Sequence, residues 1–150
     1  MFSERAQCYV REQLEKENTM AQVETKNTLR VLVVDDSVLV RARLVLMLSE
    51  LEGVEVVSLA KDAGEAVEKT GQLRPDIVLL DFRMPGGSGL TVLQAIKLLS
   101  PAPVVIMLTN YTSLQVQIKC RNAGADYFFD KSAEFEEVVN VLHEMRGLKK

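Results

Sequence analysis

The sequence contains few of the residues from which metal–thiolate centres and disulfide frameworks are built. Among its 150 residues are two cysteines, Cys8 and Cys120, and one histidine, His143. Two cysteines so far apart form neither a metal-ligand pair nor a disulfide framework, which indicates a reducing compartment such as the cytoplasm. A single histidine without clustered cysteines also disfavours a zinc site.

Long apolar runs and an excess of positive charge are lacking as well. The longest apolar runs, such as VVIML, are far shorter than the about 20 residues that a membrane helix needs, and the first residues contain no apolar core of signal-peptide length. The net charge is −3, without a basic stripe of the kind that binds nucleic acid. We therefore expect a soluble, cytoplasmic protein that binds neither a membrane nor nucleic acid directly.

What the chain has is enough apolar content, 47% of its residues, for one globular core. Residues 1–28 are polar and only weakly periodic, and are predicted to form an N-terminal extension that is flexible or a short helix. We expect one domain over residues 29–147 and a tail over residues 148–150. Met20 opens a segment that could be a complete start by itself, and we hypothesise that it is an alternative initiation site, which mass spectrometry of the native protein would test.

After residue 28, short apolar runs alternate with helical patterns. The runs predicted to be strands are LRVLVV, VEVVSLA, DIVLLD, VVIMLT and YFFDK. Strict alternation of five strands with five helices predicts parallel pairing, right-handed crossovers and helices on both faces of the sheet. The predicted fold is therefore α/β: a doubly wound, flavodoxin-like sheet of five parallel strands in the order 2-1-3-4-5, with VEVVSLA at an edge.

Details of the helices can also be predicted. Ser37 is a candidate N-cap for the first helix. In that helix Arg41 and Arg43 are expected to reach solvent. Gly71 is expected to close the second helix and Gly124 the fourth. The residues of the first helix expected to face the sheet are Val38, Val45, Leu46 and Leu48.

Polar groups follow four of the predicted strands: Asp35 and Asp36, Asp81, Thr109, and Lys131. In a doubly wound sheet they meet outside the carboxyl ends of the strands, where ligands bind. Two carboxylates about 4 Å apart repel by roughly 4 kcal/mol at an effective dielectric near 20, so the acids favour a cation. Hard oxygen ligands predict Mg²⁺ or Mn²⁺. An ammonium and a hydroxyl beside them suit a phosphoryl group, which predicts a phosphoryl-transfer site.

The motifs VVDDS, LLDFRMPGGSG, MLTN and FFDKS stand in order at these four strand ends. With them, the chain resembles the receiver domains of bacterial two-component response regulators over roughly residues 29–147. The resemblance implies that Asp81 is the phosphoacceptor, which takes a phosphoryl group from a sensor histidine kinase or a histidine phosphotransfer protein. It further implies that Lys131 pairs with the phosphoryl oxygens and that Thr109 and Phe128 form the switch. The implied metal ligands are the carboxylates of Asp35, Asp36 and Asp81 and the backbone carbonyl of Arg83.

The chain departs from the commonest pattern of that family at several places. Ser132 replaces the frequent proline after the lysine, so a cis peptide is not expected there. Phe128 lacks the hydroxyl of the tyrosine often found at the switch position, which would blunt the contrast between its inward and outward states. Asn110 stands where a small residue is frequent. Together with Arg83 and Tyr111 it is expected to restrict access of water to the phosphate and slow hydrolysis.

Output is expected through another protein, because only a few residues follow the last helix. By the resemblance, phosphorylation biases a face made by the fourth helix, the fifth strand and the fifth helix, through which a weak dimer could also form. The candidate residues on that face are Tyr111, Gln115, Lys119 and Phe128. Onward transfer in a phosphorelay is the other expected output.

Particular residues bear on the alternative functions. A scaffold or adaptor that works without phosphorylation remains an alternative, although all five site positions are intact. An aspartyl phosphatase would need a second acid two residues after the first, where Arg83 stands. A flavin-binding electron carrier would need a hydroxyl- and glycine-rich phosphate loop after the first strand. The acidic DDS at that place would repel the phosphate.

Overall fold

The computed structural model describes residues 28–149, and the side chains of the last two of these are not described. The predicted extension over residues 1–28, except for Thr28, lies outside the described residues, as do Met20 and Cys8. The boundaries of the domain therefore stay a prediction. In the described part, no helix is long and apolar enough to cross a membrane.

The core of the fold is a five-stranded parallel sheet. Its strands are β1 (Leu29–Val34), β2 (Val54–Ala60), β3 (Ile77–Leu80), β6 (Val104–Thr109) and β7 (Tyr127–Asp130). Their order is β2-β1-β3-β6-β7, and each neighbouring pair is parallel. This confirms the predicted order and the edge position of the second strand. Every residue of β3 is buried, as expected for a central strand that is covered on both faces.

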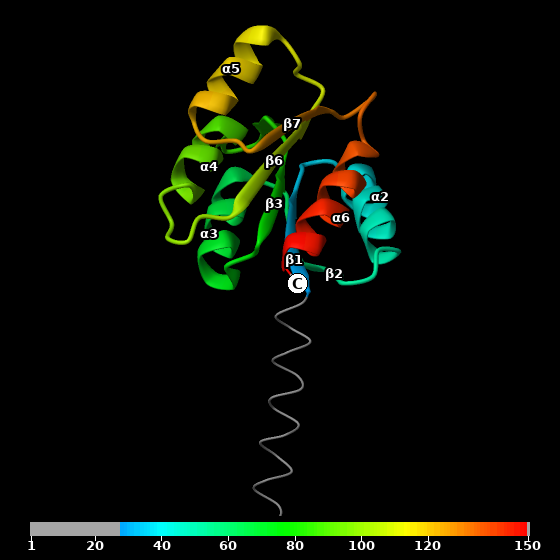
Figure 1. Cartoon of the computed structure of the whole chain (residues 1–150). Helices are drawn as coiled ribbons and strands as arrows, with labels where there is room; N and C mark the ends of the chain where they lie inside the picture. The colour runs from blue at the N-terminus through cyan, green and yellow to red at the C-terminus, as the bar shows by residue number, and fades with distance from the viewer. Residues whose placement is uncertain (1–27, 150) are drawn as a thin grey trace, which may run out of the picture.

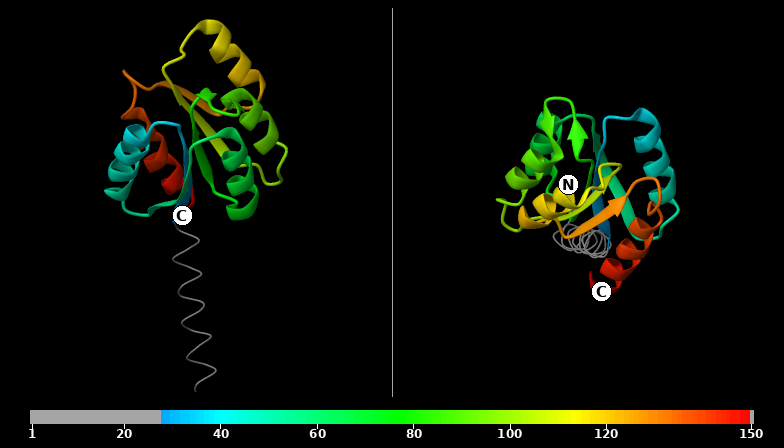
Figure 2. Two further views of the ribbon diagram at one scale, coloured as in Figure 1. Left: turned by 180° about the vertical axis from the view of Figure 1, so that it is seen from behind. Right: turned by 90° about the horizontal axis from the view of Figure 1, so that it is seen from above.

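Helices cover both faces of the sheet (Figure 1). The helices are α2 (Val38–Ser49), α3 (Ala63–Leu73), α4 (Gly89–Ile96), α5 (Leu114–Asn122) and α6 (Glu137–Lys149). Both views in Figure 2 show α2 and α6 on one side and α3, α4 and α5 on the other. Alternate strand residues supply the two cores, because successive side chains of a strand point to opposite faces. In β1, Val31 and Val33 pack under α2 and α6, whereas Leu32 and Val34 pack under α3, α4 and α5.

The predicted buried face of α2 is partly wrong. Leu48 is buried as expected, but Val38 and Leu46 are each 68% exposed, and Leu44 takes the second fully buried position. Four residues apart, Leu44 and Leu48 lie on one side of a helix with 3.6 residues per turn. Leu46 lies on the opposite side, because a step of two residues is more than half a turn.

The predicted end of α3 is also wrong, since Gly71 lies inside the helix. The helix continues to Leu73, and Arg74 caps it in the left-handed conformation with φ 48°. The guanidinium of Arg30 donates to the carbonyls of Leu73 and Arg74, which have no partner within the helix. Gly124, in contrast, follows the end of α5 as predicted, with φ 105°.

Candidate functional site

The carboxyl ends of β1, β3, β6 and β7 surround an open pocket of about 540 Å³. The structure brings Asp35, Asp36, Asp81 and Lys131 into its wall, as the strand-end pattern predicted. Arg83 lines the same pocket from β4 (Arg83–Met84), which forms a short antiparallel hairpin with β5 (Gly87–Ser88). None of the strands predicted from the sequence includes this segment.

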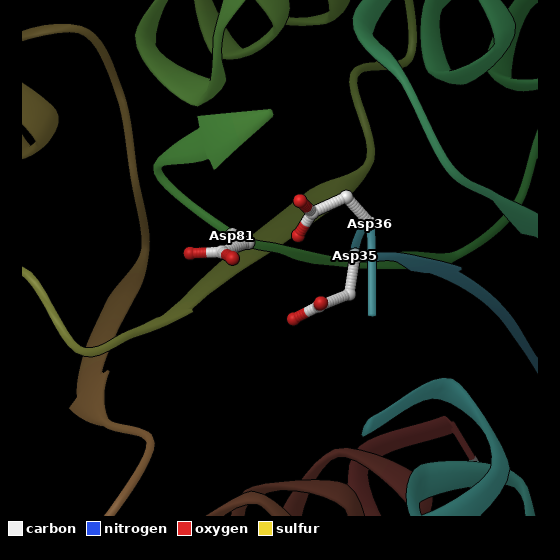
Figure 3. A group of neighbouring side chains, drawn as sticks. All are labelled: Asp35, Asp36 and Asp81. Atoms are coloured by element: carbon white, nitrogen blue, oxygen red, sulfur yellow. The ribbon is translucent and has the colours of Figure 1, made fainter. Parts of the chain in front are cut away.

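Three carboxylates form the acidic side of the pocket. Asp35 and Asp36 stand at the end of β1 beside Asp81, which follows β3 (Figure 3). One oxygen from each lies within 4.8 Å of the others. Asp35 and Asp81 are buried, whereas Asp36 is exposed. At this spacing the carboxylates repel one another, so the site is suited to bind positive charge.

Lys131 supplies positive charge from the end of β7. Its ammonium donates to Oδ2 of Asp35 at 2.5 Å and to Oδ2 of Asp81 at 2.9 Å. Burial would lower the pKa of Lys131, but the two carboxylates outweigh burial and raise it. Burial also raises the pKa of the Asp35 carboxyl, an effect that the hydrogen bonds from Lys131 and from the Ser37 N–H oppose without cancelling.

The carboxylate of Asp81 has an unused acceptor. Among the described residues, its buried Oδ1 has no hydrogen-bond partner. A buried carboxylate oxygen without a partner is costly unless a cation or donor occupies the site. The donor set consists of hard oxygens, so these residues fit a magnesium or manganese ion. The backbone carbonyl of Arg83 as a further ligand stays a prediction.

The residues assigned to the switch lie on two neighbouring strands. Thr109 ends β6 and is fully buried, and its Oγ1 accepts a hydrogen bond of 3.2 Å from the N–H of Tyr111. Phe128 lies on the neighbouring strand β7, paired with Met107 two residues before Thr109, and packs against the core under α3, α4 and α5. Phe128 is therefore outside the pocket that holds the acids.

The positions expected to control access lie at the pocket as predicted. Asn110 and Tyr111 follow Thr109, and both line the pocket together with Arg83. The guanidinium of Arg83 donates to the Tyr111 hydroxyl. Asn110 is exposed. The one cis peptide bond of the described residues precedes Pro101, so the bond between Lys131 and Ser132 is trans.

Two supporting residues were not predicted from the sequence. Arg41 was expected in solvent, but it is partly buried and its guanidinium donates to the backbone carbonyl of Asp35 at 2.7 Å. Gly89 begins α4 so close to the backbone at the end of β3 that a Cβ at that position would lie 2.1 Å from the carbonyl oxygen of Asp81. Both contacts connect a helix to a residue at a strand end, and only the place of Arg41 six residues after Asp35 could have hinted at the first.

Comparisons with known proteins agree with this geometry. A family model for the response regulator receiver domain matches residues 31–143. A protein-glutamate methylesterase/protein-glutamine glutaminase of Caldanaerobacter subterraneus subsp. tengcongensis is 50% identical over 82 residues, which are 55% of this chain and 22% of that protein. The chain thus spans about a fifth of the length of this curated relative.

Solved structures show the same similarity. The response regulator domain of Thermotoga maritima CheB is 34% identical with a TM-score of 0.70, over 81% of this chain and 96% of that one. A chain of the CheX–CheY–BeF3–Mg complex of Borrelia burgdorferi is 32% identical with a TM-score of 0.66, over 75% of this chain and 88% of that one. Because the family model covers most of the chain and the fold and strand-end residues agree with it, the chain belongs to the family of response regulator receiver domains.

Proposed function

We propose that this receiver domain is a phosphorylation-controlled switch in which Asp81 accepts a phosphoryl group with the help of Mg²⁺ or Mn²⁺. The observation that carries the proposal is the state of the Asp81 carboxylate. One oxygen is paired with Lys131, and the other is buried without a partner among the described residues. A nucleophile needs a free oxygen and neighbouring positive charge to stabilise the arriving phosphoryl group.

In the proposed reaction, Asp81 Oδ1 attacks the phosphorus of a phosphohistidine on a sensor kinase or a phosphotransfer protein. The new oxygen–phosphorus bond forms as the nitrogen–phosphorus bond breaks, and the imidazole leaves with the bonding electrons. The Lys131 ammonium lies 2.9 Å from Asp81 Oδ2, within reach of the phosphoryl oxygens. The metal ion would be held by Asp35, Asp36, Asp81 and the carbonyl of Arg83. When bound, it reduces the electrostatic repulsion between the carboxylates and the phosphoryl group.

The response would begin at Thr109. Its hydroxyl oxygen accepts from the Tyr111 N–H, which leaves the hydroxyl proton able to turn toward a phosphoryl oxygen. A shift of Thr109 would open space for Phe128 on the neighbouring strand. The surface affected is the one made by α5, β7 and α6, with Tyr111, Gln115, Lys119 and Phe128 as candidate contacts. A weak dimer through this surface is part of the proposal.

The output of the whole protein is also a proposal, because the chain spans only part of its relatives' length. We favour binding of a downstream protein or onward relay of the phosphoryl group. The exposed apolar side chains of Leu114 and Ile118 on α5 support a protein-binding surface. The cytoplasmic location expected from the sequence remains a prediction that cell fractionation would test.

The deciding experiment compares the wild type with Asp81→Asn. Both are incubated with Mg²⁺ and acetyl phosphate, and intact mass is measured. The wild type is expected to gain one phosphoryl group and the variant none. Beryllofluoride with Mg²⁺ should also shift the NMR signals of Phe128 in the wild type. If neither the adduct nor the shift appears, the scaffold or adaptor function replaces the switch.

A further inference from the structure

Arg41 contacts the acidic site through the backbone and not through a carboxylate. Its guanidinium donates a hydrogen bond of 2.7 Å to the carbonyl of Asp35. This carbonyl belongs to the peptide group that joins Asp35 to Asp36. Because a peptide group is planar, holding its oxygen sets the direction in which the chain enters Asp36.

The rest of Asp35 is held by other partners. Its N–H donates to the carbonyl of Ala60 at 3.0 Å, and its Oδ1 accepts from the N–H of Ser37 at 2.9 Å. Its Oδ2 accepts from Lys131. The hydrogen bond from Arg41 is therefore not needed to orient the Asp35 side chain.

Asp36 differs from its neighbour in this respect. Its side chain is exposed, and no hydrogen bond or ion pair to it is found among the described residues. An oxygen of Asp36 nevertheless lies within 4.8 Å of ligand oxygens from Asp35 and Asp81. The place of this carboxylate at the site thus depends on the backbone that carries it, and the hydrogen bond from Arg41 is on that backbone.

We propose that Arg41 is a positioning residue that fixes the peptide between the two acids and so holds Asp36 ready to bind the divalent cation. The inference rests on the proposed metal-assisted phosphorylation and adds a residue of α2 to it. Outer residues that orient metal ligands typically change metal affinity by about 10- to 100-fold when they are removed.

A simple charge effect would have the opposite sign. Arg41 brings positive charge toward a cation site, so removal of the charge alone should strengthen binding of Mg²⁺. Loss of positioning should weaken it. The direction of the change therefore separates the two explanations.

Isothermal titration calorimetry with Mg²⁺, on the full chain and without a phosphodonor, tests the proposal. Arg41→Gln is expected to bind Mg²⁺ about tenfold more weakly than the wild type, and Arg41→Lys should restore part of the loss. Arg43→Gln is the matched control, because Arg43 lies on the same helix with its guanidinium 4.0 Å from the Phe135 ring. Its affinity for Mg²⁺ should be unchanged. Equal or tighter binding by folded Arg41→Gln would overturn the proposal.

A double-mutant cycle with Asp36→Asn tests whether Arg41 acts through Asp36. In the Asp36→Asn background, Arg41→Gln should cause little further loss of Mg²⁺ affinity, because the group it positions has been removed. Additive losses would mean that Arg41 acts on the fold in general and would overturn the proposal. If Arg41→Gln fails to fold, the same cycle with Arg41→Lys decides between these results. Absence of Mg²⁺ binding by the wild type would refute the proposed function itself, whereas wild-type binding with an unaffected Arg41→Gln would refute only the role of Arg41.

Discussion

The guanidinium of Arg83 donates a hydrogen bond of 3.1 Å to the hydroxyl of Tyr111 and lies 4.7 Å from the centre of its ring. The two residues come from different strand ends and line the same pocket as Asp81. The Tyr111 ring also lies 6.3 Å from the ring of Phe82, which directly follows Asp81. The pair thus forms a bridge at the mouth of the site, where water would approach a phosphoryl group on Asp81.

Removal of this bridge should shorten the lifetime of the phosphorylated protein. A contact that closes the pocket and adds roughly 1 kcal/mol to the barrier for hydrolysis slows hydrolysis about fivefold. The double variant of Arg83→Ala and Tyr111→Ala should therefore dephosphorylate about fivefold faster. Tyr111→Phe, which keeps the ring and loses the hydroxyl, should show a smaller increase. Loss of the phosphoryl adduct is followed by intact mass after the phosphodonor is removed. Unchanged lifetimes would show that the bridge does not restrict water.

The ion pairs of Lys131 should stabilise the metal-free protein. Lys131→Ala would leave the carboxylates of Asp35 and Asp81 facing each other without a counter-charge, at a cost of about 3 kcal/mol in the free energy of unfolding. The loss should shrink at saturating Mg²⁺, because the cation supplies the missing positive charge. Since the folded pKa of Lys131 is raised, its contribution is fully present below the ordinary value of 10.5 and is lost as pH rises through the folded pKa.

Urea denaturation with and without Mg²⁺ measures both effects. Lys119→Ala is the control, because Lys119 is exposed on α5 and its removal should change stability by no more than about 0.5 kcal/mol. A loss of stability in Lys131→Ala that is the same with and without Mg²⁺ would show that the cation does not replace the positive charge of the Lys131 ammonium.

Much of this fold could be predicted from the sequence, because apolar runs, breakers and strand-end polar groups are local signals. The strand order and the gathering of Asp35, Asp81 and Lys131 followed from them. Contacts between distant segments could not be predicted. The cap that Arg30 provides for the end of α3 connects residues more than 40 positions apart. Gly71 is a local signal for the end of a helix, and it predicted the end of α3 wrongly. The buried face of α2 was predicted only in part because most residues there are apolar, which leaves the helical phase undetermined.

A matched pair of leucines tests the observed phase of α2. Leu48 is fully buried, whereas Leu46 is 68% exposed on the same helix. Leu48→Ala should lower the free energy of unfolding by about 2–5 kcal/mol through lost burial and a cavity. Leu46→Ala should change it by no more than about 0.5 kcal/mol. Thermal or urea unfolding of the two variants provides the comparison, and similar losses for both would show that the helix is rotated from the orientation described.

Two glycines should respond to alanine in opposite directions. A Cβ at Gly89 would lie 2.1 Å from the backbone oxygen of Asp81, so Gly89→Ala must displace the backbone of Asp81. We expect a loss of about 1–3 kcal/mol in stability together with slower phosphorylation by acetyl phosphate. Gly71 lies inside α3 with open space around it, so Gly71→Ala should stabilise the protein by about 0.5–1 kcal/mol. Destabilisation by Gly71→Ala would indicate that α3 ends there after all.

The raised pKa of Asp35 should appear in the pH dependence of cation binding. The folded, metal-free protein retains the Asp35 proton at a pH where the unfolded chain, with its ordinary value of 3.8, has already lost it. The contribution of Asp35 to the stability of the metal-free fold therefore decreases as pH rises from 3.8 through the folded pKa. Binding of a divalent cation requires the deprotonated carboxylate, so Mg²⁺ affinity should increase over the same window.

Calorimetric titrations with Mg²⁺ at a series of pH values below neutrality measure this dependence. The wild type should lose affinity on acidification with a midpoint above 3.8, the ordinary value for an aspartate. Asp35→Asn should bind more weakly at every pH and lack this component of the titration, because the amide neither ionises nor carries charge. His143 is exposed on α6 and lies outside the pocket, so His143→Gln should leave the curve unchanged and serves as the control. A midpoint at or below 3.8 would mean that Lys131 and the Ser37 N–H offset the burial of Asp35 completely.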